Sequence, residues 1–162
     1  MDIIMVEIER KFLVKNTDFK KEAFKEISIK QGFLSSEKER IVRIRLTDNT
    51  GFITVKGAPS NNGISRFEWE KEISKTDAEA LFNLCEDGRI EKTRYLIRSE
   101  NHTFEVDEFY GENEGLVVAE IELNEVSEPF AKPPWLDTEV TGDAKYYNSE
   151  LSKNPYKNWT IK

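Results

Sequence analysis

The sequence contains almost no cysteine or histidine, and this scarcity limits the chemistry available to it. Cys85 is the only cysteine and His102 the only histidine among 162 residues. A single cysteine excludes a disulfide bond within the chain. A single histidine argues against both a His-rich zinc site and a Ser-His-Asp triad. A metal ion bound by this chain would therefore need carboxylate ligands.

Long apolar segments and an excess of positive charge are also missing. No run approaches the roughly 20 apolar residues that a membrane-spanning helix requires, and residues 1–5 do not resemble a leader peptide. The formal net charge is −7 and the isoelectric point is near 5.0, which disfavours binding to nucleic acid or to an anionic membrane. We therefore expect a cytoplasmic protein with no nucleic-acid or membrane partner.

Charge is what the sequence has in abundance: 34% of its residues are charged and 38% are hydrophobic. A chain of 162 residues can bury a core without disulfides or structural metals, so we expect one domain spanning residues 1–162. The charged fraction exceeds that of an ordinary globular protein. Part of this charge is therefore expected to line an interior.

Alternating apolar and charged residues mark the first predicted strand, residues 6–14. Its apolar residues occupy one face, whereas Glu7, Glu9 and Lys11 point to the other. The same order of apolar, acidic and basic residues returns at residues 67–73, after a loop-like stretch at residues 58–63. One such strand alone would simply have a solvated charged face, but the repeat indicates a duplicated unit.

The pattern predicts a strand, a helix and three strands, used twice. In the first unit we expect the helix over residues 19–27, after an Asn-Thr-Asp cap, and strands over residues 29–34, 40–46 and 52–57. In the second, a capping box from Thr76 to Glu79 opens a helix that ends near Leu84, and strands follow at residues 89–98, 103–110 and 116–123.

Eight antiparallel strands of this length can close into a barrel that holds a ligand. We therefore predict an α+β fold: an eight-stranded antiparallel β-barrel, or tunnel, with a polar interior and with its helices packed outside. Residues 133–151 are expected to form a rigid linker and a short C-terminal helix near one mouth of the barrel.

The charged face of each strand would then point into the barrel. The acidic residues expected there are Glu7, Glu9, Glu68, Glu70, Glu72, Asp107, Glu120 and Glu122, and the basic residues are Lys11, Arg43, Arg45, Lys56, Arg66, Lys92 and Arg94. Mutual salt bridges would account for some of these charges, because burying an unpaired charge costs several kcal/mol. A cationic surface that faces carboxylates is also what a polyphosphate bridged by Mg²⁺ or Mn²⁺ requires.

At these residues the sequence resembles the CYTH, or triphosphate tunnel metalloenzyme, family. The motifs, in order, are Glu-x-Glu-x-Lys from Glu7 to Lys11, Arg-x-Arg at Arg43 and Arg45, a strand lysine at Lys56, Glu-Lys-Thr-Arg-Tyr from Glu91 to Tyr95, Asp107 after a valine, and Ala-Glu-Ile-Glu-Leu from Ala119 to Leu123. Any amphipathic strand can produce a lone Glu-x-Glu-x-Lys, but the ordered set extends over nearly the whole chain.

The resemblance implies an antiparallel tunnel that binds a triphosphate-containing small molecule and hydrolyses it with Mg²⁺ or Mn²⁺. By position, Lys11, Arg43, Arg45, Lys56 and Arg94 would bind phosphoryl oxygens, and Glu7, Glu9, Asp107, Glu120 and Glu122 would bind metal. Lys92 matches a lysine that helps to orient or activate water in some members, and we expect Glu9 and Lys11 to act with it in catalysis. Positioning and charge neutralisation are the main requirements of phosphoryl transfer.

One position departs from the family. Close bacterial relatives have Gln-Gly-Tyr where this chain has Gln31-Gly32-Phe33, so a tyrosine that is sometimes assigned a role in proton transfer lacks its hydroxyl here. Either Phe33 only packs near the tunnel mouth, or its presence changes the rate or the substrate.

We expect inorganic tripolyphosphate to be the substrate, because the compact chain has no separate element for recognising a nucleoside. The alternatives are a class IV adenylyl cyclase, a thiamine triphosphatase, and a polyphosphate-binding module without turnover, which Phe33 makes plausible. The apolar outer face would also allow packing on a second copy to form a homodimer.

Overall fold

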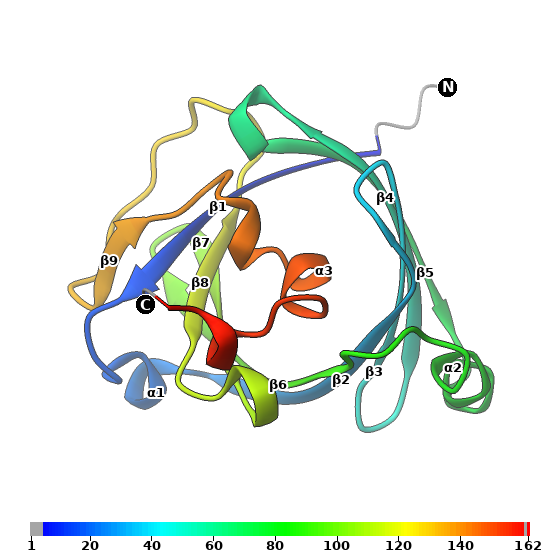
Figure 1. The fold of residues 1–162 in the computed structure, drawn as a ribbon. Coiled ribbons are helices and arrows are strands. Elements are labelled where there is room, and N and C mark those ends of the chain that lie inside the picture. Colours follow the sequence, from blue (N-terminus) through cyan, green and yellow to red (C-terminus); the bar gives the residue numbers. More distant parts are fainter. Residues whose placement is uncertain (1–4, 161) are drawn as a thin grey trace.

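Eight strands close into an antiparallel barrel in the computed structural model, which describes residues 5–160 and 162 (Figure 1). The barrel strands are β1 (Val6–Val14), β2 (Lys25–Glu37), β3 (Arg40–Leu46), β4 (Gly51–Ser60), β5 (Ser65–Ile73), β6 (Ile90–Ser99), β7 (His102–Phe109) and β8 (Val117–Glu122). Their order is β5-β4-β3-β2-β6-β7-β8-β1, and pairing of β1 with β5 closes the ring. The predicted barrel is confirmed.

The strand, helix and three-strand unit occurs twice along the chain, as predicted. The first unit holds β1, α1 (Phe19–Glu22) and β2 to β4, and the second holds β5, α2 (Lys75–Phe82) and β6 to β8. No helix within residues 5–160 has the length and apolar character needed to cross a bilayer. The expectation that residues 1–5 are not a leader falls mainly on residues 1–4, which lie outside the described residues.

Two predictions about the helices were wrong. The first helix ends at Glu22 rather than near residue 27, because Ala23 is extended and Lys25 to Ile27 pair with β6. The second helix is capped by Ser74, whose side chain accepts a hydrogen bond from the Asp77 backbone N–H, and not by Thr76.

A ninth strand, β9 (Leu136–Glu139), lies within the segment that was predicted to be a linker. It pairs with the end of β1, beyond the part of β1 that pairs with β5. The Val140 backbone N–H donates to the Lys11 carbonyl and the Lys15 N–H to the Trp135 carbonyl, both at 2.8 Å. The ninth strand thus satisfies backbone groups that the barrel leaves open.

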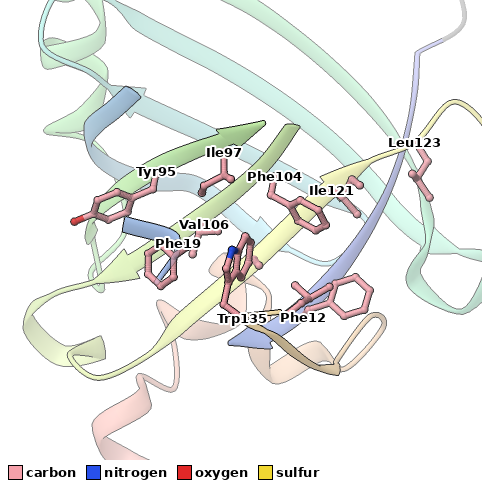
Figure 2. Close-up of a cluster of buried hydrophobic side chains, with 11 residues drawn as sticks. Phe12, Phe19, Tyr95, Ile97, Phe104, Val106, Ile121, Leu123 and Trp135 are labelled. Atoms are coloured by element: carbon pink, nitrogen blue, oxygen red, sulfur yellow. The ribbon is translucent and has the colours of Figure 1, made fainter. Parts of the chain in front are cut away.

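The apolar faces of the strands point out of the barrel, where the helices cover them. One outer cluster contains Phe12, Phe19, Tyr95, Ile97, Phe104, Val106, Ala119, Ile121, Leu123, Trp135 and Leu136 (Figure 2). In it α1 contributes Phe19 and the segment before β9 contributes Trp135. A smaller cluster of Ile44, Ala78 and Cys85 lies under α2. The prediction that these two helices pack outside is confirmed.

A further apolar cluster fills one end of the barrel. Inward-facing side chains of the strands, including Phe33, Ile41 and Phe109, pack there against Tyr146, Leu151 and Trp159. The latter belong to the C-terminal segment, residues 144–159, which contains η3 (Ala144–Tyr146), α3 (Asn148–Leu151) and η4 (Tyr156–Asn158). Figure 1 shows this segment in orange and red inside the ring of strands. The interior is therefore polar over only part of its length.

Candidate functional site

A cavity of about 190 Å³ lies inside the barrel, and charged side chains form most of its wall. These side chains are Glu7, Glu9, Lys11, Arg43, Arg45, Lys56, Arg66, Glu68, Glu70, Lys92, Arg94, Glu105, Glu120 and Glu122. All the residues predicted to act in catalysis, substrate binding or metal binding are among them except Asp107. Side chains far apart in the sequence thus meet in one place.

Strand register explains why these residues meet. Glu9 of β1 lies opposite Glu122 of β8, and Lys11 lies opposite Glu120. Residues directly opposite each other on antiparallel strands point to the same face. The alternation seen in β1 therefore continues into β8, and the two strands together present a surface of carboxylates.

Glu7, Glu9, Glu120 and Glu122 form what we call the acidic wall. Burial raises the pKa of Glu9 to about 7, and repulsion from Glu120 adds to the shift. Burial and then the Glu105 carboxylate raise the pKa of Glu122 to about 7, although Glu122 is the most exposed of the four. Burial also raises the pKa of Glu7. Burial, with repulsion between the carboxylates, therefore disfavours the charged form of three of the four carboxylates in the acidic wall.

Two lysines partly compensate the acidic wall. The Lys11 ammonium lies 2.7 Å from Glu120 and 3.2 Å from Glu9, and Lys56 lies 3.3 Å from Glu7. Burial alone would raise the pKa of Glu120, but Lys11, followed by nearby cations, holds it well below its usual range. These contacts are the mutual salt bridges that the sequence led us to expect.

Asp107 lies behind the cavity wall and is paired with two cations. Its carboxylate accepts two hydrogen bonds from Arg94, at 2.8 and 2.9 Å, and also contacts the Lys92 ammonium at 2.8 Å. Burial alone would raise the pKa of Asp107, but Arg94 and then Lys92 hold it well below its usual range. With only 2% of its surface exposed, Asp107 fixes the positions of two cavity-lining cations.

Arg43 and Arg45 are compensated less fully than Arg94. Arg43 donates to the Thr54 hydroxyl at 3.1 Å and lies 3.5 Å from Glu70, but within the described residues its Nε has no hydrogen-bond partner. Arg45 donates to the neutral Gln31 at 3.1 Å and makes no salt bridge in the described part of the chain. Burial, followed by repulsion from Arg43 and Arg94, lowers the pKa of Arg45 to about 9. These guanidinium groups are available to an anion.

Two neutral side chains that the sequence did not single out complete this part of the site. Asn148 of α3 lines the cavity and accepts hydrogen bonds from Lys92 and Gln31. Gln31 is fully buried on β2. The inward position of Gln31 could have been predicted because it lies two residues before Phe33 on the same strand. Asn148 lies in the C-terminal segment, where no strand periodicity predicts the direction of a side chain. Charge patterns alone reveal neither residue.

Comparison with known proteins supports a single family. The CYTH domain profile matches residues 5–155. An inorganic triphosphatase of Acetivibrio thermocellus is 50% identical over 94% of this chain and 97% of its own length. An inorganic triphosphatase of Nitrosomonas europaea is 36% identical over 91% of this chain and 97% of its own length.

The fold has been seen in solved structures. The crystal structure of the inorganic triphosphatase NE1496 aligns with 90% of this chain and 97% of its own, with a TM-score of 0.63 and 32% identity. A structure from Pyrococcus horikoshii, the PH1012 protein, aligns with 74% of this chain and 80% of its own, with a TM-score of 0.59. At 21% identity the latter supports the fold alone. The sequence motifs, the closed barrel and the profile match together establish that this chain belongs to the CYTH domain family.

Proposed function

We propose that this protein hydrolyses the terminal phosphoanhydride bond of inorganic tripolyphosphate and uses Mg²⁺ or Mn²⁺ to do so. The observation that carries the proposal is the acidic wall together with two guanidinium groups, Arg43 and Arg45, that have unused capacity for an anion. The two relatives named inorganic triphosphatase, at 50% and 36% identity, support the choice of substrate.

The basic residues suit a short chain of phosphates. Arg43 and Arg45 occupy successive inward positions on β3, and Lys56 and Arg94 line the same cavity from β4 and β6. Guanidinium groups bind pairs of phosphoryl oxygens through a planar fork of N–H donors. We therefore assign these residues, with Lys11, to binding phosphoryl oxygens along the substrate.

The acidic wall suits a divalent cation with oxygen ligands. Mg²⁺ and Mn²⁺ prefer such ligands, and a cation would stabilise the charged carboxylates of Glu9 and Glu122, whose pKa values are raised first by burial and then by repulsion. Within residues 5–160 no group of three or more His, Cys, Asp or Glu side chains is arranged to hold a metal ion by itself, so a cation here would need substrate phosphates or water to complete its coordination. The expected ligands are Glu7, Glu9, Glu120 and Glu122, whereas Asp107, a fifth ligand in the sequence prediction, is paired with Arg94 and Lys92 behind the cavity wall.

Hydrolysis consumes one water and converts tripolyphosphate into pyrophosphate and orthophosphate. The bound cation would neutralise charge on the phosphoryl oxygens. Arg45 and Arg94 would hold the reacting phosphate in line with the attacking water, which is the main requirement of this reaction. Lys92, which lines the cavity, would direct its ammonium at this phosphate or at the water.

The experiment that tests the proposal compares tripolyphosphate, ATP and thiamine triphosphate with each metal, and follows released phosphate and cyclic AMP together. The proposal expects phosphate from tripolyphosphate far faster than from the other two. Cyclic AMP without phosphate would identify an adenylyl cyclase, and preference for thiamine triphosphate would identify that hydrolase. Metal-dependent binding without any product would identify a binding module.

A pair of arginine variants tests the proposed substrate contacts. Arg45→Ala should raise KM for tripolyphosphate at least tenfold at saturating metal, because it removes an uncompensated cation from the cavity. Arg40→Ala, at an exposed position on the same strand, should leave KM unchanged. An unchanged KM in both variants would contradict the assignment of the basic residues.

A further inference from the structure

The C-terminal segment, residues 144–159, contributes to the cavity lining residues that do not belong to the barrel strands. Tyr147, Asn148 and Ser149 line the cavity beside the charged residues of the barrel. The sequence around them was expected only to pack near one mouth. Because the remaining polar lining comes mainly from strands, these residues are where the C-terminal segment can affect the chemistry.

Apolar packing fixes the C-terminal segment in place. Leu151, at the end of α3, has 1% of its surface exposed and packs in the cluster at the blocked end of the barrel. Tyr146 and Trp159 belong to the same cluster, and their rings meet edge to face with centroids 5.3 Å apart. Buried contacts on both sides of Asn148 therefore hold its backbone at a defined position.

The Asn148 side chain joins two cations of the site through a chain of hydrogen bonds. Its Oδ1 accepts from Lys92 Nζ at 2.8 Å and from Gln31 Nε2 at 2.5 Å. The other end of the Gln31 amide, Oε1, accepts from Arg45 Nε at 3.1 Å. Lysine and arginine can only donate, so both amides must present their oxygens to these cations. The chemistry of the partners thus fixes the orientation of each amide.

We propose that Asn148 is a positioning residue that holds the Lys92 ammonium in the geometry required for hydrolysis. Lys92 has two partners in the described residues, Asp107 on one side and Asn148 on the other, each at 2.8 Å. An ammonium has three N–H donors, so one is left over, and because Lys92 lines the cavity we assign this donor to a group bound there. The proposal rests on the proposed function, because it takes Lys92 to act on the reacting phosphate or water.

A neutral acceptor suits this position better than a carboxylate. Asp107 already supplies a negative charge to Lys92 and Arg94. A second carboxylate at position 148 would accept the same two hydrogen bonds, but it would also weaken the attraction of this part of the cavity for an anionic substrate. Asn148 fixes the direction of the ammonium and leaves the charge of the site unchanged.

The kinetic test uses Asn148→Ala, Asn148→Asp and the control Asn154→Ala, an equivalent change at an exposed position of the same segment. Asn148→Ala should lower kcat at least tenfold and change KM less than about threefold. In a Lys92→Ala background it should have no further effect, because Asn148 acts through Lys92. Asn148→Asp should instead raise KM at least tenfold. Asn154→Ala should match the wild type.

A second measurement does not depend on activity. In protein labelled with ¹⁵N-lysine, the ammonium N–H signals of Lys92, assigned by their absence in Lys92→Ala, should broaden or vanish in Asn148→Ala and persist in Asn148→Asp. Unchanged Lys92 signals in Asn148→Ala, or an equal loss of kcat in the Lys92→Ala background, would overturn the proposal. If the wild type hydrolyses no triphosphate, the proposed function fails, and the Lys92 signals alone decide whether Asn148 positions the ammonium.

Discussion

Glu9 is a residue of the acidic wall at which burial and repulsion both disfavour the charged carboxylate. Its pKa is raised to about 7, and Lys11 is its nearest cation, at 3.2 Å. Glu9→Gln removes the negative charge and keeps the volume, so metal-dependent turnover should fall roughly 100-fold or more while the fold is retained. Phosphate release at saturating Mn²⁺ measures the effect. Glu26→Gln, at an exposed position on β2, is the control, and wild-type rates in Glu9→Gln would refute the role of the acidic wall.

Phe33 occupies the position at which the resemblance to the CYTH family leads us to expect a tyrosine. Its ring has 3% of its surface exposed and belongs to the apolar cluster that holds the C-terminal segment. Phe33 also lines the cavity, so its ring contributes both to packing and to the cavity wall. Phe33→Ala should lower the free energy of unfolding by about 3 to 5 kcal/mol, as measured by urea denaturation.

The companion variant Phe33→Tyr separates packing from catalysis. If Phe33 serves only packing, the kcat of Phe33→Tyr for tripolyphosphate should stay within about threefold of the wild-type value. A tenfold or larger increase would mean that the chemistry gains from a hydroxyl at this position, and that the wild-type chain works without a group that its relatives use.

At the level of secondary-structure elements, alternation in the strands was the most informative sequence feature. It placed residues such as Glu9, Arg43 and Glu120 on the inner face, because side chains in a strand point to alternate sides whatever lies around them. The short elements were not predictable in this way. The apolar residues after Glu22 fit a helix as well as a strand, and only pairing with β6 selects the strand.

Side chains outside the strands escaped prediction for a related reason. Asn148 acquires its role from the packing of Leu151 and Trp159, which no local pattern encodes. Two prolines before Trp135 argued for a linker, yet β9 forms directly after them because the end of β1 offers free backbone groups. Tertiary contacts therefore decide the parts of the site that the charge pattern leaves open.

Trp135 connects the elements on the outside of the barrel. It has 1% of its surface exposed, and its ring meets Phe19 of α1 and Phe104 of β7 edge to face (Figure 2). Trp135→Ala should lower the free energy of unfolding by about 3 to 5 kcal/mol, as measured by urea denaturation. Trp69→Ala, at a half-buried position on the outer face of β5, should lower the free energy of unfolding clearly less than Trp135→Ala does. Equal losses would contradict a central role for Trp135.

For the whole molecule, burying so many carboxylates makes stability depend on pH and on metal. In metal-free protein the pKa of Glu9 is about 7, against 4.5 for an unperturbed glutamate, so the folded state binds more protons than the unfolded chain between these values. The free energy of unfolding should therefore decrease as the pH rises from about 5 to 7. Glu122 adds a smaller amount, because it is more exposed to solvent.

Other buried groups act outside this pH range. Asp107 and Glu120, with pKa values below the usual range, contribute stability that is lost only as the pH falls below about 4. Burial lowers the pKa of Lys92 from 10.5 to about 7. The contribution of Lys92 to the free energy of unfolding therefore increases as the pH rises above 7. The range from pH 5 to 7 therefore reports on the acidic wall.

Urea denaturation of the metal-free protein at pH 5, 6 and 7 should show a decrease of about 2 kcal/mol in the free energy of unfolding. Glu9→Gln should reduce this dependence, because it removes the group that takes up the proton. Glu125→Gln, at an exposed position, should leave this pH dependence intact.

Saturating Mg²⁺ or Mn²⁺ should reverse the slope of stability against pH, since the cation binds the deprotonated carboxylates and stabilises the folded state more as the pH rises. A wild-type stability that rises from pH 5 to 7 without metal would mean that the lysines already neutralise the acidic wall, which would remove the electrostatic reason for a cation in the tunnel.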